Sequence, residues 1–167
     1  LGRLPDVRFD YVGCPDPDPT YTRFFTPTRA ELPADLDAIG RRYVGALEAE
    51  IAKWLEGLGA AEPIGVCFSG GIDSGSVFLV TYHVLRRLGL SPARLKAFTL
   101  DLGDGPDLTQ ARAFLDRLGL GLFLEAIAAS PAGLDVDETL RVLEDYKPLD
   151  VECAAVGLAL CRGIRER

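Results

Sequence analysis

The segment CFSGGIDSGS, residues 67–76, places small, hydroxyl and acidic side chains between an apolar run and a helix-like run. Glycine lacks a Cβ atom, so the backbone can adopt unusual angles and a ligand can approach it closely. The helix that follows offers unpaired N–H groups and the positive end of its dipole, which together attract phosphate. The hydroxyl groups of Ser69 and Ser74 add further donors. On physical grounds the segment predicts a phosphate-binding site.

The spacing within this segment differs from that of two common phosphate-binding loops. A Walker loop needs a lysine after its last glycine, and the nearest downstream lysine is Lys96. The Rossmann pattern GxGxxG is absent because the glycines of the segment are spaced differently. Asp73 alone would repel phosphate, so we interpret it as a ligand for Mg²⁺ that bridges phosphate oxygens. The alternative is that Asp73 only caps a helix that begins near Ser74.

Strand-like and helix-like runs alternate along the chain around this segment. Short apolar runs rich in Val, Ile and Phe predict strands, and apolar residues at helical spacing predict helices. This alternation predicts parallel strands joined by right-handed crossovers, an α/β fold with a doubly wound parallel sheet. Such sheets bind ligands at the carboxyl ends of their strands. We expect strands at 63–68, 94–100 and 121–127, and helices at 34–59, 74–89, 107–119, 135–146 and 151–166.

Several side chains have predicted structural roles within these elements. Asp35 and Asp107 are predicted N-caps of the first and third helices. We expect Trp54 to be a packing residue and Cys67 to be a buried thiol. The predicted apolar face of the helix at 74–89 consists of Val77, Val80, Val84, Leu85 and Leu88.

Composition and charge favour one soluble globular domain. The chain has 167 residues, of which 48% are hydrophobic and 26% charged. No apolar run is long enough to cross a membrane, and the first residues do not resemble a secretory signal. A net charge of −7 without a basic stripe does not predict nucleic-acid binding. Because the four cysteines form no CxxC pair and there is one histidine, we expect no zinc site, and reduced cysteines in a cytoplasmic protein.

The predicted domain organisation has two parts. Residues 1–34 are rich in proline and turn-forming residues, which predicts an irregular N-terminal arm or linker. Residues 35–167 are the predicted globular domain, which contains the phosphate-binding segment. Because the chain begins at Leu1 and stops at Arg167 inside a helix-like run, we expect this domain to be incomplete at its C-terminal end.

The predicted strand, the residues SGGIDS that follow it and the next helix together resemble the pyrophosphate loop of the N-type ATP pyrophosphatases. This superfamily includes asparagine synthetase, GMP synthetase, NAD synthetase and several tRNA-modifying enzymes. Residues 98–119, FTLDLGDGPDLTQARAFLDRLG, resemble the second strand and helix of the asparagine synthetase domain. The matching positions are Phe98-Thr99, Gly105-Pro106-Asp107, Ala111-Arg112 and Leu118-Gly119. The resemblance covers residues 35–167 and implies a fold like that of the adenine nucleotide alpha hydrolases.

The resemblance implies that the protein adenylates a carboxylate with ATP, releases pyrophosphate and forms an amide. It implies ATP and Mg²⁺ as cofactors, a small carboxylic acid as substrate, and a glutaminase or ammonia as nitrogen source, and it leaves a homodimer open. Asp73 is the implied metal ligand, and no catalytic residue is assigned. Gly75 stands where the similar loops have a second serine. The implied loop residues are Ser69, Gly70, Gly71, Asp73 and Ser74; Cys67 and Phe68 match positions whose backbone lies near adenosine, and Leu100 matches a position that touches adenine.

Two other functions remain open from the sequence. A non-catalytic module would bind a nucleotide or a partner without turnover. A tRNA-modifying or sulfur-transfer enzyme would share the pyrophosphate loop, but the acidic net charge and the lack of paired cysteines argue against it. Release of pyrophosphate would separate an enzyme from a binding module.

Overall fold

The computed structural model describes residues 35–103, 105–144 and 146–167, so the predicted arm at 1–34 lies outside the described residues. The chain divides into two compact units, residues 1–43 and 44–167, and each is considered by itself. Helix α2 (Leu36–Glu56) contains the boundary between them. The predicted sheet and phosphate-binding segment both belong to the second unit.

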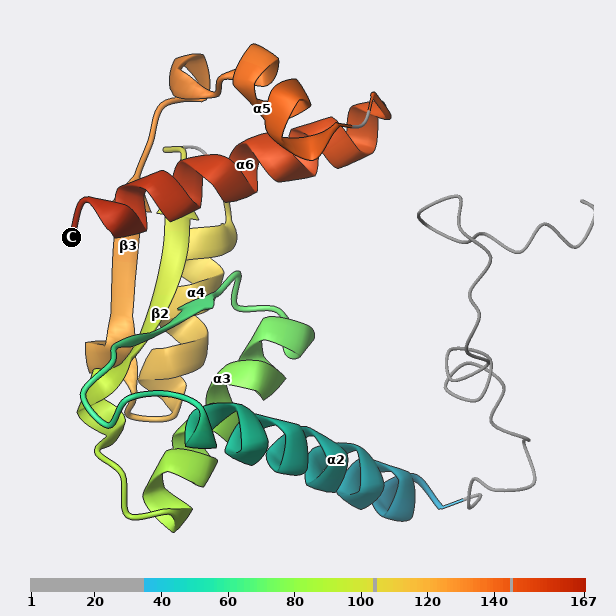
Figure 1. The fold of residues 1–167 in the computed structure, drawn as a ribbon, viewed down its shortest axis with the longest axis vertical. Helices are drawn as coiled ribbons and strands as arrows, with labels where there is room; N and C mark the ends of the chain where they lie inside the picture. The colour runs from blue at the N-terminus through green and yellow to red at the C-terminus, as the bar shows by residue number, and fades with distance from the viewer. Residues whose placement is uncertain (1–34, 104, 145) are drawn as a thin grey trace, which may run out of the picture. The chain divides into compact units, whose positions relative to one another are not determined.

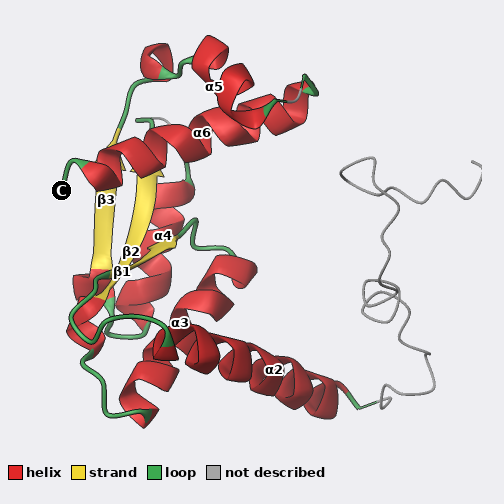
Figure 2. Cartoon of the chain, in the orientation of Figure 1, coloured by secondary structure: helices red, strands yellow, loops and turns green. Residues whose placement is uncertain are grey.

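The described part of the second unit contains three parallel strands in sequential order (Figure 2). They are β1 (Ile64–Cys67), β2 (Leu95–Asp101) and β3 (Leu124–Ala128). Helix α3 (Ile72–Arg87) connects the first two strands, and α4 (Asp107–Arg117) connects the second and third. The alternation of elements therefore correctly predicted an α/β fold with a parallel sheet.

Helices cover both faces of the sheet. In Figure 1, α6 (Pro148–Arg165) crosses in front of β2 and β3, and α4 lies behind them. Because side chains alternate along a strand, β2 contributes Leu95 and Ala97 to one layer and Phe98 to the other. The larger core packs β1 and β2 against α3 and α4, with Phe68, Phe78, Val84, Leu85 and Leu115 among its most buried side chains. The smaller core joins Phe98 and Ile127 to Leu160 of α6.

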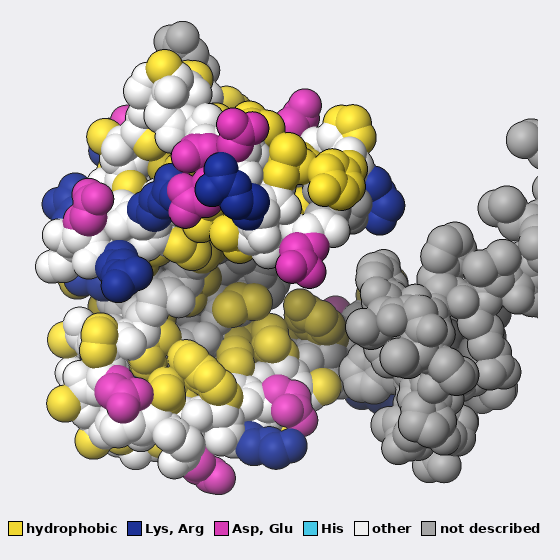
Figure 3. Space-filling view, turned by 45° about the horizontal axis from the view of Figure 1, so that its top comes forward, with side chains coloured by type: hydrophobic (Ala, Val, Ile, Leu, Met, Phe, Trp, Pro, Cys, Tyr) yellow, Lys and Arg dark blue, Asp and Glu magenta, His cyan; other side chains and the backbone are white. Residues whose placement is uncertain are grey.

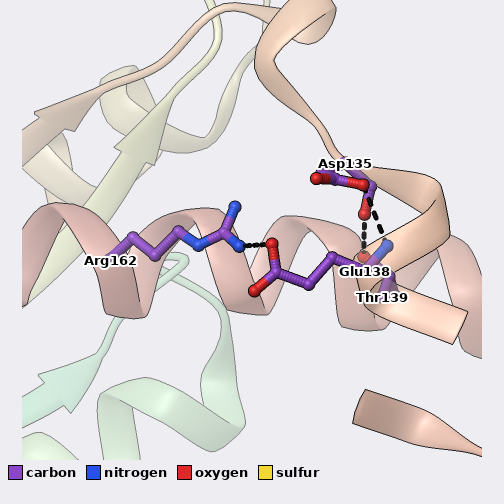
Figure 4. A network of polar contacts seen from close by, with 4 residues as sticks. All are labelled: Asp135, Glu138, Thr139 and Arg162. Atoms are coloured by element: carbon purple, nitrogen blue, oxygen red, sulfur yellow. Dashed lines mark hydrogen bonds and ion pairs between the residues drawn. The ribbon is translucent and has the colours of Figure 1, made fainter. Parts of the chain in front are cut away.

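An ion pair joins helix α5 (Val136–Leu143) to α6 (Figure 4). Arg162 of α6 forms an ion pair with Glu138 in the first turn of α5. Asp135 is the N-cap of α5, because its carboxylate accepts the N–H of Glu138 at 2.9 Å. The carbonyl of Asp135 also accepts the hydroxyl of Thr139 at 2.6 Å. One short segment therefore both begins α5 and fixes it to the helix that covers the sheet.

Helix boundaries differ from the sequence prediction at several points. The Asp35 cap is confirmed, since its carboxylate accepts the N–H of Asp37 at 3.0 Å. The prediction that Asp107 is an N-cap is wrong, because α4 begins at Asp107 and its N-cap is Pro106. Helix α6 begins at Pro148, where the fixed φ of proline suits the first helical position. The third strand starts later than predicted because residues Gly121–Phe123 form a 3₁₀ turn.

Predicted packing also differs from the structure at two places, the apolar face of α3 and Trp54. Val77 and Leu88 are 38% and 47% exposed, whereas Phe78, absent from the predicted face, is fully buried. Trp54 is 51% exposed, so it is not an interior packing residue.

Among the described residues, no helix has the length and apolar character that a membrane span requires.

The connection between α2 and β1 is held by a single arginine. Arg94 donates from Nε to the carbonyl of Glu62 at 2.6 Å. Its two terminal nitrogens donate to the carbonyls of Ala60 at 2.9 Å and Gly59 at 2.8 Å. The planar guanidinium therefore spans three backbone acceptors just before the first strand.

We predict that Arg94→Ala lowers the free energy of unfolding by about 2 kcal/mol, because three charge-assisted hydrogen bonds are lost. Arg94→Lys should recover only part of this, since an ammonium group lacks the fork geometry. Arg112→Ala on the exposed side of α4 is the control, with a loss below about 0.5 kcal/mol. Urea unfolding measures all three variants. Equal stability of the Arg94→Ala and Arg112→Ala proteins would contradict this account of the connection.

Candidate functional site

The predicted phosphate-binding residues lie at the junction of β1 and α3. Helix α3 begins at Ile72 with Gly71 as its N-cap, and no described side chain forms a capping hydrogen bond there. Asp73 lies within the first turn and is exposed. The alternative that Asp73 caps a helix near Ser74 is therefore wrong, because the helix starts before it. The first N–H groups of α3 are left for another acceptor.

The serine hydroxyls lie inside the loop and form long contacts with its backbone. The N–H of Ser69 points to Oγ of Ser74 at 3.3 Å, and the N–H of Gly71 points to Oγ of Ser69 at 3.3 Å. The two hydroxyl oxygens are themselves 3.3 Å apart, and Ser74 donates to the carbonyl of Gly71 at 3.3 Å. These distances exceed the usual ranges of about 2.7–3.2 Å for N–H···O bonds and about 2.5–3.0 Å for O–H···O bonds. A phosphate oxygen could replace such weak partners at little cost.

Position 70 requires glycine because the loop approaches α4 closely there. The φ of Gly70 is +76°, in the left-handed region, and the residue is buried. A Cβ at this position would lie 2.6 Å from the backbone nitrogen of Ala111 and 2.8 Å from its Cα. Any other residue would therefore push the loop away from α4 as well as strain its backbone. The second glycine, Gly71, has an extended backbone and more space.

Two side chains outside the motif hold carbonyl groups of the loop. Thr99 of β2 is buried, and its hydroxyl donates to the carbonyl of Phe68 at 2.6 Å. Gln110 of α4 donates from Nε2 to the carbonyl of Gly70 at 3.1 Å. Sequence reasoning missed Gln110, because nothing in its local pattern distinguishes it from an ordinary exposed helix residue. Thr99 was noted only as part of a family resemblance.

The remaining predicted site residues lie on two different faces of the sheet. Phe68 is 2% exposed and packs edge-to-face with Phe78 and Phe114 in the larger core. Both of its backbone polar groups bond to β2, since its N–H donates to the carbonyl of Phe98 at 2.8 Å and Thr99 holds its carbonyl. Phe68 therefore supports the loop through core packing and backbone hydrogen bonds, and its side chain does not face the opposite side of the sheet.

Cys67 and Leu100 share the opposite face. Cys67 is paired with Phe98 in the sheet register, and Leu100 lies two residues further along β2 on the same face as Phe98. Leu100 is half-buried, whereas Cys67 is exposed, so the prediction of a buried thiol is wrong. Among the described residues, α6 makes its main sheet contacts with β2 and β3, and Cys67 of β1 stays partly in solvent. Figure 3 shows the surface hollowed beneath α6, with hydrophobic side chains in the hollow.

The environment of Cys67 alters its acidity. Although the side chain reaches solvent, partial burial raises the pKa of the Cys67 thiol, and the nearby Cys161 of α6 raises it further. The thiol is therefore a neutral, weakly polar group at physiological pH. Such a surface is compatible with the flat ring of a nucleobase.

The residue types at the loop fit a magnesium ion that arrives together with phosphate. Within the described ranges, no group of three or more His, Cys, Asp or Glu residues is arranged to hold a metal ion. Mg²⁺ is commonly bound by one or two carboxylates together with phosphate oxygens. Asp73, exposed in the first turn of α3, is a carboxylate suited to that role.

A family model described as asparagine synthase matches residues 56–167, which is 112 of the 167 residues. The match begins at the last residue of α2 and includes the sheet, the loop and both crossover helices. The chain belongs to the asparagine synthase family. A comparison with curated proteins found no match. Membership in this family indicates ATP-dependent chemistry of the amidation type.

The resemblance to the pyrophosphate loops implies a serine at position 75, where this chain has Gly75, and the structure makes that difference testable. A Cβ at Gly75 would lie 2.8 Å from Cζ of Phe114, so the phenylalanine ring occupies the space. We predict that Gly75→Ser lowers the free energy of unfolding by about 1–2 kcal/mol through overpacking. In a Phe114→Leu background the same substitution should cost less. Chemical denaturation of the double-mutant cycle measures this coupling, and additive effects would contradict it.

The raised pKa of Cys67 predicts slow alkylation near neutral pH, because the thiolate is the nucleophile. The rate of reaction with iodoacetamide, followed by mass spectrometry of the Cys67 peptide, should have a pH midpoint above that of N-acetylcysteine. Cys161→Ser should lower this midpoint, because it removes one cause of the shift. Cys153→Ser is the matched control and should leave it unchanged. A midpoint at or below that of N-acetylcysteine would contradict this description of the site.

Proposed function

We propose that this member of the asparagine synthase family binds Mg²⁺ and ATP at the β1–α3 loop and adenylates a small carboxylic acid. The main support is the loop itself, whose N–H and hydroxyl donors lie at an uncapped helix start. Attack of the carboxylate on the α-phosphorus would release pyrophosphate, and an amine would then displace AMP to form an amide. A glutaminase or free ammonia would supply the nitrogen.

The loop residues would stabilise the pyrophosphate as it leaves. Negative charge builds on this group when its bond to the α-phosphorus breaks, and fixed donors aimed at it lower the barrier. The N–H groups of Ser69 and Gly71, the hydroxyl of Ser74 and the first turn of α3 are these donors. When bound near Asp73, Mg²⁺ would add positive charge at the phosphate oxygens. No protein nucleophile is needed for this reaction.

The open face of β1 and β2 is the proposed place for the adenine ring. Leu100 offers a half-buried apolar surface. Cys67 lies on the same face, and its thiol is neutral. Moving a planar apolar ring from water onto such a surface lowers the free energy.

The free thiols at Cys67, Cys153 and Cys161 are consistent with a proposed cytoplasmic location, where thiols stay reduced.

Binding of the magnesium complex of the nucleotide should depend on Asp73. In calorimetric titrations with Mg²⁺ and α,β-methylene-ATP, we expect the wild type to bind and Asp73→Ala to bind about tenfold or more weakly, since a charged metal contact is lost. Glu152→Ala, which removes an exposed acidic side chain from α6, is the control and should bind like the wild type. Equal affinity of the wild-type and Asp73→Ala proteins for the magnesium complex would contradict the role of Asp73.

The products of ATP turnover distinguish the proposed reaction from its alternatives. With a set of small carboxylic acids and ammonia, we expect AMP and pyrophosphate, because attack occurs at the α-phosphorus. Chromatography of the nucleotides and an enzymatic pyrophosphate assay measure both. ADP and phosphate would contradict the proposal, and tight binding without any product would favour a non-catalytic nucleotide-binding module.

A further inference from the structure

The pyrophosphate loop is held from outside at two of its carbonyl groups. Thr99 donates to the carbonyl of Phe68 at 2.6 Å from the neighbouring strand, and Gln110 donates to the carbonyl of Gly70 at 3.1 Å from α4. These donors come from positions 31 and 40 residues away in the sequence. Neither side chain belongs to the glycine-rich motif.

Fixing these carbonyls also fixes two N–H groups. A trans peptide is planar, so its C=O and the following N–H point in opposite directions. The carbonyl of Phe68 shares a peptide plane with the N–H of Ser69, and the carbonyl of Gly70 shares one with the N–H of Gly71. No cis peptide occurs among the described residues. When Thr99 and Gln110 pull the carbonyls outward, both N–H groups therefore turn into the loop.

The two sides of these peptides differ in how tightly they are bound. On the carbonyl side the distances are 2.6 and 3.1 Å, and the Thr99 bond is buried. On the N–H side the serine hydroxyls accept at 3.3 Å in both cases. The orientation of the peptides is thus set from outside the loop, while their donors remain easily available to a stronger acceptor. Gly70 also approaches α4 so closely that a Cβ would lie 2.6 Å from the backbone nitrogen of Ala111, so the loop cannot move further toward α4.

We infer that Gln110 and Thr99 are positioning residues that aim the N–H groups of Gly71 and Ser69 at a bound pyrophosphate group. This inference rests on the proposed function and extends the site beyond its motif to β2 and α4. Because both residues act on the loop, they should affect the affinity for pyrophosphate and leave the affinity for adenosine unchanged. A merely structural role would change both ligands together or neither.

The test compares Gln110→Met, which keeps the side-chain length without the donor, with the wild type. Calorimetry with Mg²⁺-pyrophosphate should give an affinity about fivefold to tenfold lower, the usual effect of one hydrogen bond. Adenosine should bind with unchanged affinity. Thr109→Val, a neighbouring exposed position on α4, is the control and should match the wild type.

Thr99 offers a second and independent comparison because two substitutions separate its hydroxyl from its packing. Thr99→Val keeps the shape and removes the donor, so it should weaken Mg²⁺-pyrophosphate binding. Thr99→Ser keeps the donor and should recover most of the affinity. Urea unfolding of each variant identifies any loss that comes from a general change in stability.

The outcomes distinguish this inference from the function on which it rests. If the wild type binds Mg²⁺-pyrophosphate and both Gln110→Met and Thr99→Val bind it equally well, the inference is wrong and the proposed function stands. If the variants lose affinity for adenosine and pyrophosphate alike, the residues are structural and the inference is also wrong. If the wild type binds neither ligand, the proposed function fails and the inference fails with it.

Discussion

The contact between Gly70 and the start of α4 is the constraint on which the candidate site depends. There is no space for a Cβ at Gly70, because it would lie 2.6 Å from the backbone nitrogen of Ala111. Helix α4 cannot move back to make room, since Ala111 and Leu115 are fully buried in the larger core. The loop after β1 is therefore shaped by a helix that belongs to the next crossover. This links the phosphate-binding segment to the packing of the whole sheet.

The two faces of the sheet have different roles around this contact. On the α3 and α4 side, Phe68, Phe78, Phe114 and Phe123 form edge-to-face pairs with ring centroids 5.6–5.9 Å apart. Such a close-packed layer holds β1 and the start of α3 in place. On the α6 side, Cys67 of β1 reaches solvent in the part of the chain that the structure describes. The rigid face thus supports the loop, and the open face offers space for a ligand.

The sequence was sufficient to predict the elements that carry the site, because they follow local rules. Apolar runs gave β1 and β2, and the glycine pair at 70–71 indicated a tight junction before a helix. Predictions that depended on contacts between distant elements were less successful. Cys67 was expected to be buried because its neighbours are apolar, but α6, the described helix on this face, packs mainly on β2 and β3. Gln110 has no local signal, since its role depends on a loop 40 residues earlier.

The central claim is that the N–H groups of the loop between β1 and α3, those of Ser69 and Gly71 among them, bind the pyrophosphate group of ATP. The most direct measurement is the ¹⁵N–¹H NMR spectrum of the protein during titration with Mg²⁺-pyrophosphate. The account predicts that the amide signals of Ser69 and Gly71 shift strongly as their weak serine partners are replaced, while those of α5 remain in place. If Mg²⁺-pyrophosphate leaves the Ser69 and Gly71 signals unchanged, the loop does not bind this group and the account is wrong.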